Sequence, residues 1–223
     1  MIDFAAARRM MVDGQVRTSD VTDLRLIAAM LEIPRERFVP QDKADLAYLD
    51  FDLPVMEGTD GALARRLLKP MVLAKLIQAA EIGASDRVLD VGCATGYSSA
   101  VLSRLAGAVT ALEQEPALAR RAREILQTLG ASNVTVVTGP LIEGWPAAAP
   151  YDAILLNGST EIEPQALLRQ LKDGGRLVGV RGRGGAGKAV LARAFGREVS
   201  GRPIFDAAAP LLPGFAQPAV FVF

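Results

Sequence analysis

The residues with the clearest chemical meaning form one short stretch, in which an apolar run leads into closely spaced glycines. The run Val88–Val91 contains Asp90 and continues directly into Gly92–Gly96, which reads Gly-Cys-Ala-Thr-Gly. Glycines allow a sharp turn and let the backbone approach a ligand where a Cβ would clash. A helix that opens straight after such a turn presents free N–H groups to the ligand. The pattern therefore predicts a nucleotide-type ligand held at a strand-to-helix turn.

The spacing of the two glycines distinguishes between nucleotide-type ligands. A dinucleotide-binding turn reads G-x-G-x-x-G, whereas this one reads Gly92-x-x-x-Gly96. The next apolar run, Val109–Leu112, ends at Glu113, where an acidic residue can accept hydrogen bonds from both hydroxyls of a ribose. Together these features favour S-adenosylmethionine (SAM), which carries no pyrophosphate. The competing interpretation is an ordinary turn with a surface charge at Glu113, and Glu115 is a near alternative for the acid.

The sequence contains no histidine, which removes whole classes of chemistry. Histidine general bases, Ser-His and Cys-His nucleophile pairs and histidine-bearing zinc sites are excluded. We therefore predict no metal site, and the sequence identifies no catalytic residue. Cys93 is the only cysteine, so an intramolecular disulfide is impossible. With no base visible beside it, Cys93 is interpreted as a small residue in a tight turn and not as a reactive thiol.

The composition indicates a globular protein with no overall attraction to polyanions. Half of the 223 residues are apolar, and 25 basic residues balance 25 acidic ones. No net charge therefore recruits nucleic acid or a membrane surface. No run approaches the roughly 18 apolar residues of a membrane helix, and Met1–Met11 lacks the apolar core and cleavage site of a secretory signal. We predict a cytoplasmic protein with neither nucleic-acid nor membrane partners.

The elements that must position the turn follow from short apolar runs that alternate with helical periodicity after residue 86. Strands are predicted at 87–91, 109–112, 134–138, 153–156 and 176–180, and further strands at 189–195 and 219–223 joined by a Pro/Gly-rich connection. Helices are predicted between the earlier strands at 97–105, 116–129 and 164–171. Alternation at this spacing indicates βαβ units and a buried parallel sheet.

The first 82 residues read as a helical extension of that core. Helices are predicted over 5–16, over 19–31 with an N-cap at Ser19 or Asp20, and over 63–82, where Pro70 either starts a helix or breaks it. The fold class is therefore α/β: a Rossmann-like, doubly wound, mostly parallel sheet with an N-terminal helical part. We treat residues 1–223 as one domain, with 1–82 as the helical part and 83–223 as the core.

A second glycine-rich stretch resembles a phosphate-binding loop in spacing only. Gly182–Lys188 has the G-x-x-x-x-G-K pattern and follows a predicted strand. However, Ala189 stands where a serine or threonine should hold Mg²⁺, and a strand-like run follows in place of a helix. A turn between two strands is the better interpretation.

With the glycine turn and the helical extension in place, the chain resembles the protein-L-isoaspartate O-methyltransferases along nearly its whole length. The motif Leu89–Gly96 fits that family, and its combination with N-terminal helices makes the match more specific than a general methyltransferase pattern. Further matching stretches are Met11-Val12, Gln15-Val16-Arg17, Ala29-Met30, Ile33-Pro34-Arg35, Phe38-Val39-Pro40, Ala47-Tyr48, Leu53-Pro54, Gly144-Trp145-Pro146, Pro150–Ile154 and Leu171–Leu177.

The resemblance implies a reaction. A methyl group would pass from SAM to the free carboxylate of an isoaspartyl residue in a damaged protein or peptide, and the ester would then cyclise to a succinimide as a step of protein repair. This chemistry suits a chain without histidine, because the carboxylate is already ionised and the sulfonium is already an electrophile. Positioning and electrostatics can then carry the displacement. The resemblance also implies that the last strands of the sheet depart from simple parallel order.

The resemblance also implies where the cofactor lies. Glu113 would hold the ribose, the Gly92–Gly96 turn the methionine end, and Asn157 would face the transferred methyl group. Gly139 and Leu141 would flank the adenine. The full set of candidate cofactor-binding residues is Asp90, Gly92, Cys93, Ala94, Gly96, Glu113, Gln114, Gly139, Leu141 and Asn157.

Two departures from the family pattern fall at this site. The family carries a serine two residues before a proline in the loop that precedes the first long helix, and alignment on Pro70 puts Leu68 there. Leucine offers a carboxylate no hydrogen bond, and Thr59 lacks a proline at the right distance to replace the serine. The family also has Gly-Asp after the third strand, where this chain has Gly139-Pro140. One lost hydrogen bond costs about 0.5–1.5 kcal/mol, so Pro140 alone would weaken SAM binding about tenfold.

These departures leave alternatives open beside isoaspartyl repair. One is a methyltransferase with a changed acceptor, such as a small organic acid or another protein carboxylate. The other is a protein that binds SAM without catalysis. The sequence leaves the oligomeric state open as well.

Overall fold

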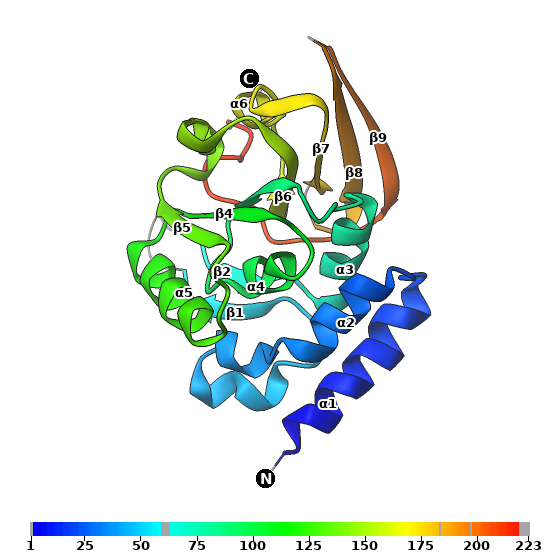
Figure 1. The fold of residues 1–223 in the computed structure, drawn as a ribbon, viewed down its shortest axis with the longest axis vertical. Coiled ribbons are helices and arrows are strands. Elements are labelled where there is room, and N and C mark those ends of the chain that lie inside the picture. Colours follow the sequence, from blue (N-terminus) through cyan, green and yellow to red (C-terminus); the bar gives the residue numbers. More distant parts are fainter. Residues whose placement is uncertain (1, 59–62, 183, 197, 219–223) are drawn as a thin grey trace, which may run out of the picture.

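The computed structural model describes residues 2–58, 63–182, 184–196 and 198–218 and centres on a seven-stranded sheet (Figure 1). In spatial order its strands are β5 (Val134–Thr138), β4 (Ala108–Glu113), β3 (Arg87–Val91), β6 (Tyr151–Thr160), β7 (Leu171–Arg181), β8 (Lys188–Phe195) and β9 (Glu198–Asp206). The strands from β5 to β7 pair in parallel, whereas β8 and β9 pair antiparallel. The prediction of a mostly parallel sheet whose last strands break the order is confirmed.

Helices and a small hairpin surround this sheet. The α-helices are α1 (Phe4–Met11), α2 (Leu24–Glu32), α3 (Pro70–Ala79), α4 (Tyr97–Ser103), α5 (Pro116–Thr128) and α6 (Gln165–Leu168). Strands β1 (Leu53–Met56) and β2 (Arg65–Leu67) form a separate antiparallel pair. No helix among the described residues is long and apolar enough to cross a membrane.

The core lies in two apolar clusters on opposite faces of the sheet. Successive strand residues point to opposite faces, and on β3 Val88 belongs to one cluster and Leu89 to the other. The first cluster contains the buried sides of α2 to α5, whereas the second is closed by α6, by Leu141 and by Leu212 and Phe215 of the C-terminal segment. Helices therefore cover one face heavily, and short segments cover the other.

The N-terminal part differs from the sequence prediction at two helix starts. The predicted N-cap at Ser19 or Asp20 is wrong, because Ser19 Oγ donates to Gln15 O as the preceding helical turns continue, and Asp20 adopts a left-handed φ of 61°. Asp23 caps α2 instead, since its Oδ1 accepts from the N–H groups of Arg25 and Leu26.

The predicted helix over 63–82 is also shorter than expected. α3 begins at Pro70, which occupies its first turn, and Lys69 before it is extended with ψ of 145°. A residue before proline disfavours the helical region, which explains why the helix cannot run back to residue 63. Residues Arg65–Leu67 pair with β1 as a strand.

The C-terminal part differs in three places. The predicted helix over 164–171 shrinks to α6, because Leu171 already pairs with Tyr151 at the start of β7. The segment taken as a Pro/Gly-rich connection contains β9, an edge strand in which Pro203 is tolerated because one side of the strand needs no ladder bonds. The strand predicted at 219–223 lies outside the described residues.

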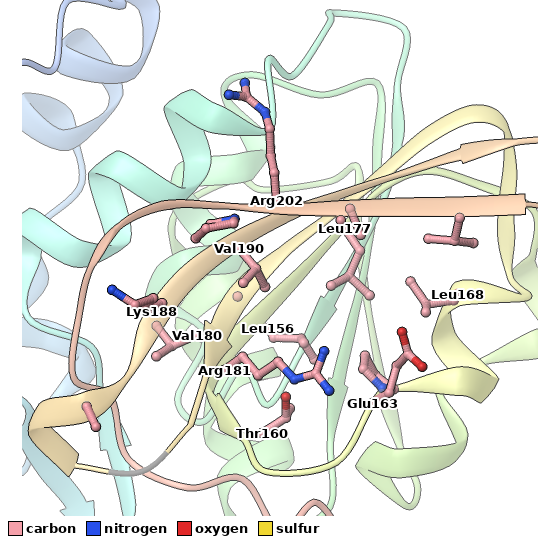
Figure 2. Close-up of a pocket in the computed structure, with 17 residues that line it drawn as sticks. Leu156, Thr160, Glu163, Leu168, Leu177, Val180, Arg181, Lys188, Val190 and Arg202 are labelled. Atoms are coloured by element: carbon pink, nitrogen blue, oxygen red, sulfur yellow. The ribbon is translucent and has the colours of Figure 1, made fainter.

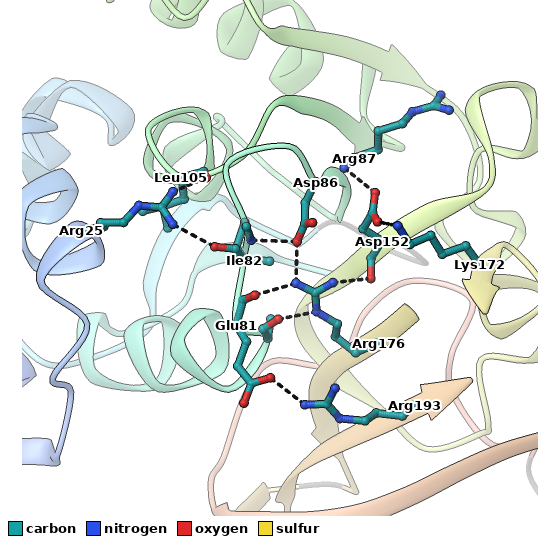
Figure 3. A network of polar contacts seen from close by, with 12 residues as sticks. Arg25, Glu81, Ile82, Asp86, Arg87, Leu105, Asp152, Lys172, Arg176 and Arg193 are labelled. Carbon is teal, nitrogen blue, oxygen red and sulfur yellow. Dashed lines mark hydrogen bonds and ion pairs between the residues drawn. The ribbon is translucent and has the colours of Figure 1, made fainter. Parts of the chain in front are cut away.

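A polar network fixes the helical layer to the amino end of the central strands (Figure 3). Arg176 of β7 donates to the carbonyls of Ala80 (2.5 Å), Glu81 (2.6 Å) and Asp152 (3.0 Å) and to Asp86 Oδ2 (2.5 Å). The guanidinium is largely buried, so these bonds form in a region of low dielectric, where they are strong. The network holds the strand starts in register, and the site forms at the opposite ends of the same strands.

Candidate functional site

The glycine turn lies at the carboxyl end of β3, where the direction of the sheet order reverses. From β3 the chain builds outward through β4 and β5 on one side, and then through β6 and β7 on the other. Ligands of open parallel sheets bind in the crevice at such a switch point. Gly92 and Gly96 have φ of 74° and 93°, which favours glycine, and Gly96 directly precedes α4. The N–H groups of Gly92 and Cys93 both donate to Leu112 O, so β4 fixes the turn.

Asp90 lies under this turn and is fully buried. Its Oδ2 accepts from the hydroxyls of Ser98 (2.7 Å) and Ser99 (2.5 Å) at the start of α4, and its Oδ1 accepts from Asn157 Nδ2 (2.5 Å). Burial raises the pKa of Asp90 to about 6, and the three hydrogen bonds limit that rise. Asp90 therefore joins β3, α4 and β6, and two of the predicted residues, Asp90 and Asn157, are in direct contact.

Glu113 lies at the tip of β4, also without solvent exposure. Its carboxylate accepts from the backbone N–H groups of Ala94 (2.7 Å), Gln114 (2.9 Å) and Glu115 (3.2 Å). It also accepts from Arg65 through Nη2 (2.8 Å) and Nε (3.3 Å). The surface interpretation of Glu113 is therefore wrong: the charge is buried and held in a cradle of donors. Gln114 contributes its backbone to this cradle, while its side chain is exposed.

The residues expected beside the adenine lie close to the turn. The N–H of Gly139 donates to Glu113 O (3.2 Å), and a Cβ at position 139 would lie 3.3 Å from the Trp145 ring. Leu141 is fully buried, with Cδ1 3.5 Å from the place of a Cβ at Gly92. The structure thus brings Gly139, Leu141 and the turn together at one edge of the sheet.

Leu68 lies beside the glycine turn, at a small cavity with both apolar and polar lining residues. Leu68, at the position of the family's serine, is 2% exposed, and its carbonyl accepts from the buried Arg35 Nη2 at 2.8 Å. Leu68 lines a cavity of about 10 Å³ together with Gly92 and Asn157. The alignment on Pro70 therefore does bring position 68 to the site. Thr59, the alternative, lies outside the described residues.

The structure agrees with the interpretations given above for Cys93 and for the second glycine-rich stretch. Burial raises the pKa of the Cys93 thiol well above its usual range, so a thiolate nucleophile is disfavoured. In the part of the second glycine-rich stretch that the structure describes, Gly184–Ala186 forms a short 3₁₀ turn between β7 and β8, and the strand β8 follows from Lys188. Among the described residues, no cluster of cysteines and acidic residues could hold a metal ion.

A pocket of about 450 Å³ lies elsewhere, over the face of β6 to β9 and beside α6 (Figure 2). Leu156, Leu177 and Val190 form its apolar wall, and Arg181 and Arg202 stand at its border. None of the candidate cofactor-binding residues lines it. This pocket is therefore separate from the glycine turn.

Sequence reasoning missed several residues of the site. Ser98 and Ser99 could have been recognised, because hydroxyls in the first turn of α4 face the preceding strand. Arg65 and Leu212 gave no local signal: Arg65 comes from the β1–β2 hairpin, and Leu212 Cδ2 reaches within 2.9 Å of a Cβ built on Gly92 from a segment far along the chain. Such contacts depend on the complete fold.

Comparison with known proteins identifies the family of this chain. The family model of protein-L-isoaspartate(D-aspartate) O-methyltransferase matches residues 7–192. The protein-L-isoaspartate O-methyltransferase 1 of Rhodopseudomonas palustris (strain HaA2) is 42% identical over 175 residues, which make up 78% of this chain and 69% of that protein.

Solved structures give the same result. A protein-L-isoaspartate O-methyltransferase with a TM-score of 0.79 and 26% identity covers 93% of this chain, which in turn spans 66% of the length of that protein. A Plasmodium falciparum protein, solved in complex with S-adenosyl-L-homocysteine, shares the fold with a TM-score of 0.74 at 17% identity and covers 92% of this chain and 97% of its own. The present chain belongs to the protein-L-isoaspartate(D-aspartate) O-methyltransferase family.

Proposed function

We propose that this protein is a SAM-dependent carboxyl methyltransferase that acts on isoaspartyl residues of damaged proteins. The observation that carries the proposal is the buried Glu113 carboxylate beside the Gly92–Gly96 turn, at the carboxyl ends of adjacent parallel strands. The family to which the chain belongs is named for this reaction. The same proposal makes the protein a repair enzyme of the cytoplasm, where its single buried cysteine would stay reduced.

The residues around the turn fit SAM in their chemistry. Glu113 provides a carboxylate that can accept from ribose hydroxyls once Arg65 moves away. Gly92 keeps the turn free of a Cβ, which would lie 2.9 Å from Leu212 and 3.0 Å from Arg65. Pro140 offers no side-chain acceptor to the adenine amino group, which we expect to weaken the fit by about one hydrogen bond. The side chains of Arg65 and Leu212 must move aside to admit the cofactor.

When bound, SAM would supply a methyl group on a positively charged sulfur. The chain would then have to orient the cofactor, hold the acceptor carboxylate in line and exclude water. Glu113 would fix the ribose, and the buried Leu68 and Leu141 would provide apolar walls that exclude water. No residue needs to remove a proton from an ionised carboxylate, which agrees with a chain that lacks histidine.

The test is methyl transfer from labelled SAM to an isoaspartyl peptide. The matched aspartyl peptide serves as the specificity control, and an active enzyme of the same family serves as the assay control. We expect label in the isoaspartyl peptide only. Equal labelling of both peptides would point to another acceptor, and no labelling despite binding of S-adenosylhomocysteine would contradict the proposed reaction.

A further inference from the structure

Arg65 is a buried arginine that the chemistry described so far does not use. Its side chain is 3% exposed and its only acceptor among the described residues is Glu113, which it contacts through two nitrogens at 2.8 and 3.3 Å. Removing one member of a buried ion pair is strongly destabilising, because the remaining charge is left unpaired. In the described structure Arg65 therefore depends on Glu113 as its charge partner.

Glu113 cannot keep Arg65 as its partner and also hold a ribose. Three backbone N–H groups and both Arg65 nitrogens already occupy its two oxygens, which together offer about four lone-pair positions. Arg65 Nη2 also lies 3.0 Å from a Cβ built on Gly92, so the guanidinium covers the turn that the cofactor would contact. Binding of a nucleoside there must release Arg65 from Glu113.

Two arginines lie near the acceptor side of the site: Arg66 lines the small cavity and donates to Asp52 O at 3.3 Å, and Arg65 lies against Gly92, which lines the same cavity. Leu68 offers no hydrogen bond, while Asp90 and Glu113 are both buried carboxyl groups that repel an incoming carboxylate when ionised. Arg65 and Leu67 are the buried residues of β2 and lie on one face of that strand, and Leu67 lines the small cavity beside Leu68 and Asn157. A rotation of the Arg65 side chain can therefore turn the guanidinium from Glu113 toward this cavity.

The geometry points to Arg65 as the residue that binds the carboxylate of the methyl acceptor, an inference that rests on the proposed function. Glu113 holds Arg65 while the site is empty, and the ribose hydroxyls of the cofactor take its place. The freed guanidinium then pairs bidentately with the acceptor carboxylate, as its planar geometry favours. One carboxylate oxygen forms the new O–CH₃ bond, the S–CH₃ bond breaks with its electron pair staying on sulfur, and Arg65 keeps all its protons.

This arrangement makes acceptor binding depend on the cofactor. Without a ribose, Arg65 stays paired with Glu113 and the carboxylate has no partner. With S-adenosylhomocysteine bound, the guanidinium is free, so the protein should distinguish an isoaspartyl peptide from the analogue in which the free carboxylate is a primary amide. A bidentate pair with a charged group corresponds to a preference of about tenfold or more.

The experiment is calorimetric titration of the two peptides into the full-length protein, with and without saturating S-adenosylhomocysteine. We expect the wild type to prefer the carboxylate peptide at least about tenfold only when S-adenosylhomocysteine is present. Arg65→Gln should abolish the preference while the affinity for S-adenosylhomocysteine stays equal or rises, because nothing competes for Glu113. The exposed Arg120→Gln on α5 is the matched control and should change neither.

Three results would overturn the inference. One is a carboxylate preference that survives Arg65→Gln, another is a preference that does not need S-adenosylhomocysteine, and the third is equal loss of peptide and S-adenosylhomocysteine binding in Arg65→Gln. If Arg65→Gln does not fold, Arg65→Lys keeps the charge but loses the bidentate geometry, and it should reduce the preference several-fold without loss of S-adenosylhomocysteine affinity. A failure of the proposed function is distinguishable, because wild-type protein would then bind S-adenosylhomocysteine and still prefer the carboxylate peptide without methylating it.

Discussion

Asn157 of β6 donates through Nδ2 to Oδ1 of Asp90 on β3, at 2.5 Å and away from solvent. The same amide reaches Val91 O at 3.3 Å, so one side chain joins the two strands at the switch point of the sheet. The bond leaves Asp90 with hydrogen-bond donors from both a helix and a neighbouring strand, which is how a buried carboxyl group is accommodated.

The first prediction concerns this bond. Asn157→Ala should destabilise the protein by about 1–3 kcal/mol in urea unfolding, because a buried acceptor loses a partner. It should also weaken S-adenosylhomocysteine binding in calorimetry, since Asp90 and the turn shift together. Asn133→Ala is a matched control: Asn133 Nδ2 bonds the carbonyls of Ser103 and Ala106, so its loss should lower stability but leave the ligand affinity intact. Equal S-adenosylhomocysteine affinity in the two variants would show that Asn157 does not contribute to ligand binding.

The second prediction is a pH dependence caused by Asp90. Its pKa is raised to about 6 in the folded protein, so between pH 4 and 6 the folded state holds a proton that the unfolded state has released. The free energy of unfolding should therefore fall as pH rises through this window, by about 3 kcal/mol relative to Asp90→Asn, and stay level above it. Urea unfolding of both proteins from pH 4 to 8 measures the difference. If the free energy of unfolding of the wild type, relative to Asp90→Asn, rises with pH in this window, the pKa of Asp90 is not raised by folding.

A third prediction tests the ribose role of Glu113. Glu113→Gln keeps the size of the side chain but removes the charge, and we expect the dissociation constant of S-adenosylhomocysteine to rise about tenfold or more. Glu115→Gln, two residues along, should leave it unchanged, because the Glu115 backbone but not its side chain contacts Glu113. The reverse order of effects would favour Glu115 as the ribose acceptor.

The fourth prediction concerns the departure at position 68. Leu68→Ser should lower stability by about 2–4 kcal/mol, because a buried leucine side chain is lost. If a hydroxyl there assists the acceptor carboxylate, kcat/KM for the isoaspartyl peptide should rise in Leu68→Ser but not in Leu68→Ala, which loses similar volume without adding a hydroxyl. Steady-state kinetics at a temperature where both variants are folded decides this, and parallel changes in the two would show that only volume matters.

The fifth prediction contrasts a buried arginine with an exposed one. Arg176→Ala leaves several backbone carbonyls and Asp86 without their donor and should cost about 2–4 kcal/mol in urea unfolding. Arg193→Ala removes only the exposed ion pair with Glu81 and should cost less than about 1 kcal/mol. Similar costs for the two would mean that the network in Figure 3 does not anchor the strand starts.

Regular strands bounded by turn residues were predictable from the sequence. β3 and β5 have the predicted bounds, since apolar runs between turn residues leave little alternative. β9 was not predictable, because Gly201 and Pro203 are unusual in strands and are accepted here only at an edge. The start of α3 at Pro70 was one of two alternatives, and pairing of Arg65–Leu67 with β1 decided between them.

For the site, too, the sequence could predict only what depends on residues close to one another along the chain. Residues that are local to the turn were predictable, because Asp90, Gly92, Gly96 and Glu113 lie in two adjacent strand ends whose spacing is visible in the sequence. The contacts that these residues make with other parts of the chain were not predictable. The burial of Glu113 depends on Arg65, and the closure of the turn depends on Leu212, and both come from segments that only tertiary packing brings near.

The contact of Trp145 with Gly139 has a practical consequence. The sequence holds a single tryptophan, and its ring lies against the backbone where the adenine is expected. Intrinsic fluorescence of this protein therefore reports on one corner of the molecule without interference from other indoles. A nucleoside that settles along Gly139 would change the polarity around the ring and shift its emission. Trp145 can therefore serve as an intrinsic fluorescent probe, so that nucleoside binding can be measured by titration without a label.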